Sequence, residues 1–231
     1  MSLESPNPQS AFSDAGHVAR YAEGPPRMVP GFFDMHRMTT LLLAERVPDK
    51  GCVLVVGAGG GLELKTFALA QPGWTFEGVD PSSEMIRLAE RTLGALVSRV
   101  RFNNGIIDAA PAGPFDAATC LLTMHFLDRN ERLRTAIEVH RRLKPGAPFV
   151  LVHLSIPANT GERVMWMSRF AAFGNSSGLS TKDSQSALAA AESHLNILTP
   201  EQDEAILREA GFSNVSLFYA GFTFRGWVAY A

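Results

Sequence analysis

Short apolar runs alternate with amphipathic segments from residue 52 to residue 154. The first run, Cys52–Val56, is β-branched and has no polar interruption, as is typical of a strand buried on both faces of a sheet. By the same reasoning we expect strands at Cys52–Val56, Trp74–Val79, Val100–Asn103, Phe115–Thr123 and Phe149–Leu154. Strands that alternate with helices predict an α/β fold with a doubly wound, mainly parallel sheet.

Helical patterns fill the gaps between the predicted strands. We expect helices at Leu62–Ala70 and Ser83–Leu96, the second with apolar residues at i, i+3 and i+4 spacing. A further helix begins after Asp128, which stands three residues before Glu131 in a capping-box arrangement. The sequence "LKPG" at residues 143–146 ends this helix.

The C-terminal part has a different pattern. Thr199 and Gln202 form a second capping-box sequence before a predicted helix at Asp203–Ala210. The segment "VSLFYAGFTFRGWVAYA" then offers two strand-like stretches around Ala220-Gly221. We expect these stretches to pair as an antiparallel hairpin.

The 231 residues suit a single domain. We expect a flexible tail at 1–14, a helical cap at 15–50 that is broken at "EGPPRMVPGF", and a ligand-binding core at 51–155. A helical insertion at 156–198 follows a strand end, where ligands bind in open α/β sheets, so we interpret it as a substrate lid. Residues 199–231 supply the last helix and the hairpin.

Composition narrows the possible partners. Hydrophobic residues make up 46% and charged residues 19% of the chain, and the net charge is −2. This balance favours a globular protein that binds neither nucleic acid nor a membrane. The N-terminus does not resemble a signal peptide, and Cys52 and Cys120 lack the spacing of metal ligands. We therefore expect a cytoplasmic protein with free thiols and no bound metal.

The sequence "VLVVGAGGGLELKTFA" at residues 53–68 ends a predicted strand in a glycine loop. Gly57, Gly59 and Gly61 allow unusual φ angles and a close approach of a ligand to the backbone. Position 62 is leucine, so the dinucleotide fingerprint G-x-G-x-x-G is not met, and a P-loop sequence is also missing. Asp80 ends the second strand, where a carboxylate can bind both hydroxyls of a ribose. Such an acid fits NAD and S-adenosylmethionine alike.

Together these stretches resemble the class I S-adenosylmethionine-dependent methyltransferases, in particular their small-molecule branch. The resemblance covers about residues 50–155 and rests on four sequences: "VLVVGAGGG", "GVDPSSEMIRLAE", "FDAATCLLTMHFL" and "LKPGAPFVLV". It implies a Rossmann-like sheet of seven strands, about five of them parallel, with helices on both faces and a C-terminal antiparallel hairpin.

The resemblance also implies the roles of individual residues toward S-adenosyl-L-methionine. The glycine loop would pass under the methionine part, Asp80 would bind the ribose, and Met85 would pack on the adenine. Leu121 and Leu122 would offer carbonyl groups to the amino group, and Tyr21 would close over the cofactor. The full set of expected cofactor residues is Tyr21, Gly57, Ala58, Gly59, Gly61, Asp80, Pro81, Met85, Gly105, Ile106, Ile107, Leu121 and Leu122.

The chain departs from the family pattern at two positions. The family usually has an acidic residue two positions before the first glycine, where this chain has Val55. The family also often has Gly-Asp at the end of the third strand, where this chain has Gly105-Ile106. The backbone of Ile106 and Ile107, or the carboxylate of Asp108, would then have to serve the adenine.

Methyl transfer from a sulfonium mainly requires that the acceptor be positioned and water be excluded. A general base is needed only for a protonated acceptor, and His125, after the fourth strand, is the candidate. The expected substrate residues are Arg27, His153, Trp166 and Phe170. The aromatic side chains among them favour a small, partly apolar acceptor.

Three other functions stay open at this stage. The "MHFL" sequence at 124–127 and the proline-broken N-terminal segment also resemble carboxy-S-adenosylmethionine synthases, which use the cofactor without methyl transfer. A non-catalytic scaffold that kept the fold is a second alternative, and NAD-dependent oxidoreduction is the third. A homodimer is also left open.

Overall fold

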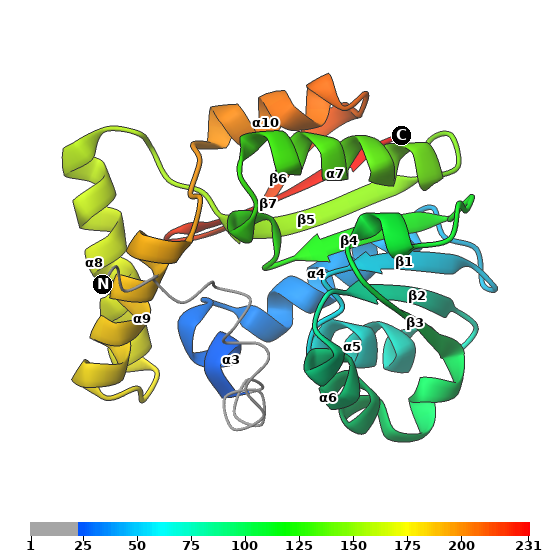
Figure 1. Ribbon diagram of the computed structural model, residues 1–231, viewed down its shortest axis with the longest axis horizontal. Helices are drawn as coiled ribbons and strands as arrows, with labels where there is room; N and C mark the ends of the chain where they lie inside the picture. Colours follow the sequence, from blue (N-terminus) through cyan, green and yellow to red (C-terminus); the bar gives the residue numbers. More distant parts are fainter. Residues whose placement is uncertain (1–22) are drawn as a thin grey trace, which may run out of the picture.

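A seven-stranded sheet forms the centre of the computed structural model, which describes residues 23–231 (Figure 1). The strand order is β3-β2-β1-β4-β5-β7-β6, and β7 runs antiparallel to both of its neighbours. The strands are β1 Cys52–Val56, β2 Thr75–Asp80, β3 Val100–Asn104, β4 Ala117–Leu121, β5 Pro148–Leu154, β6 Ser213–Gly221 and β7 Phe224–Tyr230. The predicted α/β fold, with five parallel strands and a C-terminal hairpin, is confirmed.

Helices cover both faces of the sheet (Figure 1). On one face lie α4 Phe32–Ala44, α5 Leu62–Ala70 and α6 Ser83–Leu93. On the other face lie α7 Arg129–Arg142 and α10 Pro200–Glu209. The remaining helices are α3 Gly24–Met28, α8 Thr160–Ser176 and α9 Thr181–His194, with short 3-10 turns η2 Gly94–Arg99, η3 Ile107–Ala109 and η4 Met124–Phe126.

Strand β1 shows why the sheet separates two cores. Side chains alternate across a strand, so Val53 and Val55 point to the core beneath α4 and α5. Leu54 and Val56 belong to the core beneath α7 and α10. The whole strand is buried beyond its first residue, which explains its continuous apolar sequence.

Both predicted capping boxes are present. The side chain of Asp128 accepts a hydrogen bond from the N–H of Glu131 at 2.9 Å, and Glu131 accepts one in return from the N–H of Asp128 at 3.0 Å. Thr199 and Gln202 make the same reciprocal pair at the start of α10. These local signals therefore set the start of two helices on one face of the sheet.

Several element boundaries differ from the sequence expectation; the fourth strand, for example, is Ala117–Leu121 rather than Phe115–Thr123. The proline-rich segment contains a short helix, α3, because Pro25 and Pro26 occupy first-turn positions, where a missing N–H costs nothing. Helix α6 ends at Gly94, whose φ of 56° is left-handed, and the chain continues as a 3-10 turn. The hairpin turns at Phe222-Thr223 rather than at Ala220-Gly221.

The insertion at 156–198 is helical, as predicted. Helix α8 packs against α3, and a Cβ added to Gly174 would lie 2.7 Å from the sulfur of Met28. Helices α8 and α9 stand together at one end of the sheet (Figure 1). Their role as a substrate lid stays a prediction.

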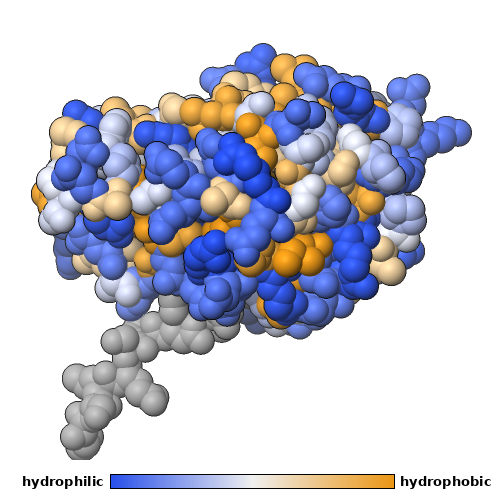
Figure 2. All heavy atoms as spheres, turned by 90° about the horizontal axis from the view of Figure 1, so that it is seen from above, coloured by the Kyte–Doolittle hydropathy of each residue, from blue (hydrophilic) through white to orange (hydrophobic). Residues whose placement is uncertain are grey.

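The view from above shows the side of the molecule that carries α7 and α10, where hydrophobic residues are interspersed with hydrophilic ones (Figure 2). Among residues 23–231, no helix is both long and apolar enough to cross a membrane. The predicted tail at 1–14, the first part of the 15–50 cap and Tyr21 lie outside the described residues.

Candidate functional site

A cavity lies where the connections from β1 and β4 leave the sheet in opposite directions. These two strands are neighbours, although β2 and β3 separate them in the sequence, so their C-terminal ends form the switch point of the sheet. The cavity has a volume of about 330 Å³. Its size and position suit a small-molecule ligand.

The backbone donors of the glycine loop are used inside the protein. The N–H groups of Gly57 and Ala58 both donate to the carbonyl of Val79, at 2.8 and 3.0 Å. The N–H of Gly61 donates to the carbonyl of Ala58 at 3.1 Å, and the N–H of Gly59 donates to a side chain of β2. A phosphate cradle needs such N–H groups to point at the ligand. These four donors do not, which argues against a pyrophosphate-binding loop.

Asp80, at the end of β2, ties the glycine loop to the next turn. Its Oδ2 accepts a hydrogen bond from the N–H of Gly59, and its Oδ1 accepts one from the N–H of Ser82, both at 2.9 Å. Burial raises the pKa of Asp80, and these two hydrogen bonds oppose the increase. A carboxylate has about four acceptor positions, so each oxygen retains capacity for a ligand hydroxyl.

Two glycines of the loop are required by close packing. A Cβ on Gly57 would lie 2.1 Å from the hydroxyl of Thr123, and a Cβ on Gly61 would lie 2.9 Å from the Cα of Ala89 in α6. Both residues also have a left-handed φ, of 74° and 77°. Gly59 differs from them, because its nearest obstacle is 3.5 Å away and it lines the cavity. Its missing side chain leaves room for a ligand.

Most of the cofactor residues expected from the sequence meet at this cavity. Met85 is buried on α6, whose first turn is capped by the side chain of Ser82. Ile106 is half exposed, whereas Ile107 is buried. The expected residues that line the cavity are Gly57, Gly59, Asp80, Pro81, Met85, Gly105, Ile106, Ile107 and Leu122.

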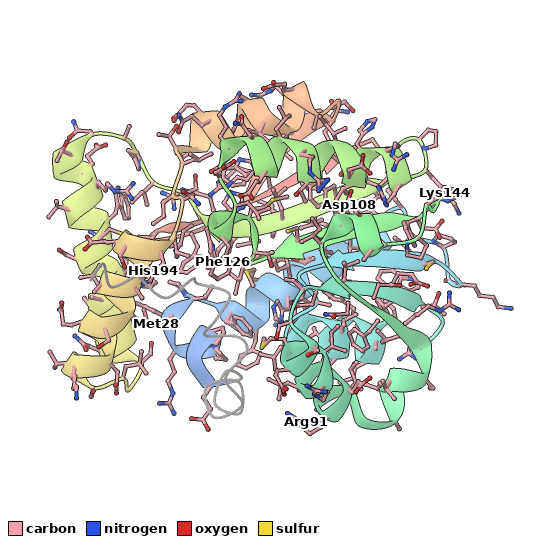
Figure 3. All side chains as sticks on the ribbon, in the orientation of Figure 1. Met28, Arg91, Asp108, Phe126, Lys144 and His194 are labelled. Atoms are coloured by element: carbon pink, nitrogen blue, oxygen red, sulfur yellow. The ribbon has the colours of Figure 1, made fainter. Side chains whose placement is uncertain are left out.

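Helix α7 and the turn before it contribute residues that the sequence reasoning missed. These are Thr123, Phe126, Leu127, Glu131, Arg134 and Thr135. Phe126 follows β4 in the middle of the molecule (Figure 3). The sequence contains a signal for this helix face, because Glu131, Arg134 and Thr135 have i, i+3 and i+4 spacing in a predicted helix that follows the fourth strand.

Asp108, which had been considered for the adenine, has another partner. Its carboxylate accepts hydrogen bonds of 3.1 and 2.6 Å from the guanidinium of Arg134 on α7. Both side chains are about half exposed (Figure 3 labels Asp108). Arg134 lines the cavity, whereas Asp108 is not among the described residues that do. This geometry does not support an adenine contact by Asp108, which stays a prediction.

A second, smaller cavity of about 20 Å³ lies on the other side of the glycine loop. It is lined by Pro25, Phe32, His36, Gly57, Gly59, Gly60, Leu62, Glu63, Leu121 and Leu122. Gly57, Gly59 and Leu122 line both cavities. The loop and the end of β4 therefore separate two parts of one candidate site.

Two buried polar side chains line the smaller cavity. Within the described chain, Nδ1 of His36 and Oε1 of Glu63 have no hydrogen-bond partner. Burial lowers the pKa of His36 to about 4, so its imidazole is neutral at pH 7. Burial, and then the nearby charge of Asp80, raises the pKa of Glu63 well above its usual value.

Leu122 has an uncommon backbone conformation at the point where the two cavities meet. Its φ is 57°, a left-handed value that is costly for a residue other than glycine. Its N–H donates to the carbonyl of Val152 at 2.6 Å, which holds this conformation in place. The carbonyl of Leu121 accepts a hydrogen bond from the hydroxyl of Thr123 at 3.1 Å.

His125 and His153 lie in the interior rather than at a cavity surface. Nδ1 of His125 accepts a hydrogen bond from the N–H of Leu154 at 3.2 Å, and burial lowers the pKa of His125 well below its usual value. Nε2 of His153 lies 3.1 Å from Oδ1 of Asp203, beside the ring of Trp227. The described cavity-lining residues include neither histidine. This geometry does not support a catalytic role for His125 or substrate contact by His153, so both stay predictions.

The other expected substrate residues also lie away from the two cavities. Arg27 is partly exposed and faces Glu23 within α3 at 3.9 Å. Trp166 packs under the guanidinium of Arg169, 4.5 Å from its ring centre, and Phe170 belongs to the core. In the part of the chain that the structure describes, no three His, Cys, Asp or Glu side chains group as a metal site would require.

Comparison with known proteins gives three consistent results. A family model described as "Methyltransferase domain" matches residues 54–149. The carboxy-S-adenosyl-L-methionine synthase of Chromohalobacter salexigens is 28% identical over 217 residues, which cover 88% of this chain and 77% of that protein. The synthase of the same name from Campylobacter curvus is 23% identical and covers 88% of this chain and 87% of its own length.

Solved structures show the same fold. Human N-acetylserotonin methyltransferase, solved in complex with S-adenosylmethionine, aligns over 100% of this chain with a TM-score of 0.67 and 13% identity. An O-methyltransferase family protein from Burkholderia thailandensis aligns over 97% with a TM-score of 0.69 and 16% identity. The chain spans 60% and 62% of the length of these two proteins.

Proposed function

Because the chain belongs to the class I S-adenosylmethionine-dependent methyltransferase family, we propose that it binds S-adenosyl-L-methionine and transfers the cofactor's methyl group to a small, partly apolar acceptor. The observation that supports this proposal most is the pair of cavities that share the glycine loop. The larger cavity suits an adenosine, and the smaller one has room for one small group at the amino-acid end of the same ligand.

The residues present fit this cofactor. Asp80 keeps acceptor capacity for the ribose hydroxyls, and Met85 offers an apolar surface to the adenine. Gly59 leaves the space that a side chain would fill. The loop N–H groups are already bonded, which suits a cation such as a sulfonium better than an anionic pyrophosphate.

When bound, the cofactor supplies a methyl group that its sulfonium has already activated for displacement. The remaining task of this chain is to orient the acceptor and to exclude water. Leu122 and Phe126, beyond the end of β4, supply apolar surface to the larger cavity. A general base among the described cavity residues is not required if the acceptor arrives deprotonated.

A second candidate function is synthesis of carboxy-S-adenosyl-L-methionine. It is favoured by the two synthases reported above, which align with 88% of this chain. A carboxylate next to the sulfonium would call for a cation at the smaller cavity. Within residues 23–231, however, the lining of that cavity includes neither lysine nor arginine, and the imidazole of His36 is neutral. The guanidinium of Arg134 lines the larger cavity instead and is paired with the carboxylate of Asp108. Methyl transfer therefore remains our first proposal.

The two functions differ in where the cofactor's methyl carbon goes. We would incubate the purified protein with S-adenosylmethionine labelled at this carbon and with a small-molecule extract, and analyse the products by mass spectrometry. Methyl transfer predicts S-adenosylhomocysteine and a labelled acceptor. Carboxy-cofactor synthesis predicts that the label stays on the sulfonium in a species heavier by one carbon dioxide unit. Heat-inactivated protein is the control.

Calorimetry with S-adenosylhomocysteine separates both enzymes from a non-catalytic scaffold. Micromolar binding would support either enzyme. Failure to bind at millimolar ligand would contradict the proposed function and would favour a scaffold.

A further inference from the structure

Glu63 is a buried acid to which the proposed function assigns no role. It lies in the first turn of α5, two residues after Gly61, and only 9% of its surface is exposed. Its Oε1 lacks a hydrogen-bond partner in the described structure, although the side chain lines the smaller cavity. An unpaired buried carboxyl is costly for a protein to retain, so it calls for an explanation.

The position of Glu63 relates to one of the two departures from the family pattern. Val55, at the position where the family usually carries an acid, is fully buried in the core beneath α4 and α5. Glu63 reaches the cavity from α5, which covers that same face. Glu63, on the helix after the glycine loop, can therefore take the place of the acid that the family usually has at the position of Val55 on β1.

We propose that Glu63 binds the α-ammonium group of the cofactor's amino-acid end. This inference rests on the proposed function and assigns a residue to the smaller cavity. The cavity volume of about 20 Å³ exceeds the volume that one water molecule needs, and an ammonium group is of similar size. Glu63 is the acid among the described residues that line this cavity. Gly57, Gly59 and Gly60 complete its wall on the loop side, where a small group can approach the backbone.

The surroundings of Glu63 add a measurable consequence. The titratable groups near it are Asp80 at the end of β2, Cys120 on β4, and His36, which lines the same cavity from α4. Burial and the charge of Asp80 raise its pKa well above the usual range. An ammonium partner favours the carboxylate and lowers this pKa. Binding therefore releases any proton that Glu63 carries at the working pH into the solvent.

The test compares two ligands that differ in the amino-acid end. S-adenosylhomocysteine carries the ammonium group, whereas 5′-methylthioadenosine keeps the nucleoside and sulfur without it. We expect Glu63→Gln to weaken binding of S-adenosylhomocysteine about ten- to a hundredfold, since a hydrogen bond between charged groups is lost. Binding of 5′-methylthioadenosine should stay within about twofold of the unsubstituted protein. Glu90→Gln, at an exposed position of α6, is the matched control and should change neither affinity.

A second readout follows the proton. Calorimetry at a series of pH values, in buffers of different ionisation enthalpy, should show proton release when the unsubstituted protein binds S-adenosylhomocysteine, and a smaller release for Glu63→Gln. Equal affinities of both proteins for S-adenosylhomocysteine would overturn the assignment of Glu63 while the proposed function stands. If the unsubstituted protein fails to bind either ligand, the proposed function itself fails. If Glu63→Gln loses 5′-methylthioadenosine as well, Glu63 has a structural role only, and Glu63→Leu then has to show the same loss.

Discussion

The carboxylate of Asp80 holds the glycine loop, because its Oδ2 accepts a hydrogen bond of 2.9 Å from the backbone N–H of Gly59. The two residues are 21 positions apart: Asp80 ends β2, and Gly59 lies in the loop that follows the neighbouring strand β1. The same carboxylate binds the N–H of Ser82, so one side chain arranges two loops at the edge of the larger cavity. This residue therefore positions the site in addition to its proposed contact with the ribose.

Asp80→Ala is expected to weaken binding of S-adenosylhomocysteine by about 1.5–3 kcal/mol, through loss of charge-assisted hydrogen bonds. It should also lower the free energy of unfolding by about 1 kcal/mol, since the N–H groups of Gly59 and Ser82 lose their acceptor. Calorimetry and urea unfolding measure the two effects. Asp34→Ala, which removes an exposed acid of α4, should leave ligand affinity unchanged. An unchanged affinity in Asp80→Ala would contradict the ribose contact.

Alanine substitutions at Gly57 and Gly59 should separate folding from binding. Gly57→Ala places a Cβ 2.1 Å from the Thr123 hydroxyl at a left-handed φ, so we expect a loss of stability greater than the roughly 1–2 kcal/mol of the backbone strain alone. Gly59→Ala carries the strain without that clash and should fold, but its Cβ enters the ligand space. Urea unfolding together with calorimetry tests this contrast. Normal ligand affinity in Gly59→Ala would show that the ligand does not approach the loop.

Two buried histidines that are neutral in the folded state should lower the stability of the free protein in mild acid, against an opposite contribution from the raised pKa of Glu63. Burial lowers the pKa of His36 to about 4 and that of His125 well below 6.5, whereas in the unfolded chain both bind protons near pH 6.5. At these two histidines the unfolded state therefore binds more protons between pH 6.5 and 4, so their contribution to stability falls as the pH falls through this window. His36 alone should cost about 2 kcal/mol between pH 7 and pH 5.

Urea unfolding at several pH values checks this expectation. His36→Gln should reduce the loss of stability between pH 7 and pH 5, since one of the two groups no longer titrates. His194→Gln, at the end of α9, is the control and should leave the pH dependence unchanged. A pH profile of His36→Gln that matches the unsubstituted protein would show that His36 is not buried as a neutral group.

The buried ion pair between α7 and α10 should contribute more to the free energy of unfolding than an exposed pair between the same helices. Nη1 of Arg132 lies 2.6 Å from Oδ1 of Asp203, and both side chains are about 2% exposed. Asp203→Ala leaves a buried guanidinium without its charge partner, which typically costs about 3–5 kcal/mol. The exposed pair of Arg129 and Glu209 joins the same two helices, and Glu209→Ala should cost less than about 1 kcal/mol. Denaturant unfolding compares the two variants, and equal losses would contradict the difference in burial.

Local sequence patterns predicted much of the fold because they are short-range. The capping residues Asp128 and Thr199 marked helix starts that the structure confirms, and the apolar sequence of Cys52–Val56 marked a buried strand. Predicted element boundaries were wrong where one local sequence signal is compatible with two different structures. Two prolines can break a helix or begin one, and Pro25 and Pro26 begin α3.

The sequence by itself determined the α/β fold, the glycine loop and the acid at Asp80, because the positions of strands and helices, the loop spacing and the strand ends follow from local sequence patterns. Only the tertiary structure decided which side chains reach the cavities. His125 and His153 lie in the interior, and Asp108 pairs with Arg134. Glu63 and His36, on two different helices, line one small cavity. The direction of a side chain depends on the packing of elements distant in the sequence, and residue spacing along one element does not contain that information.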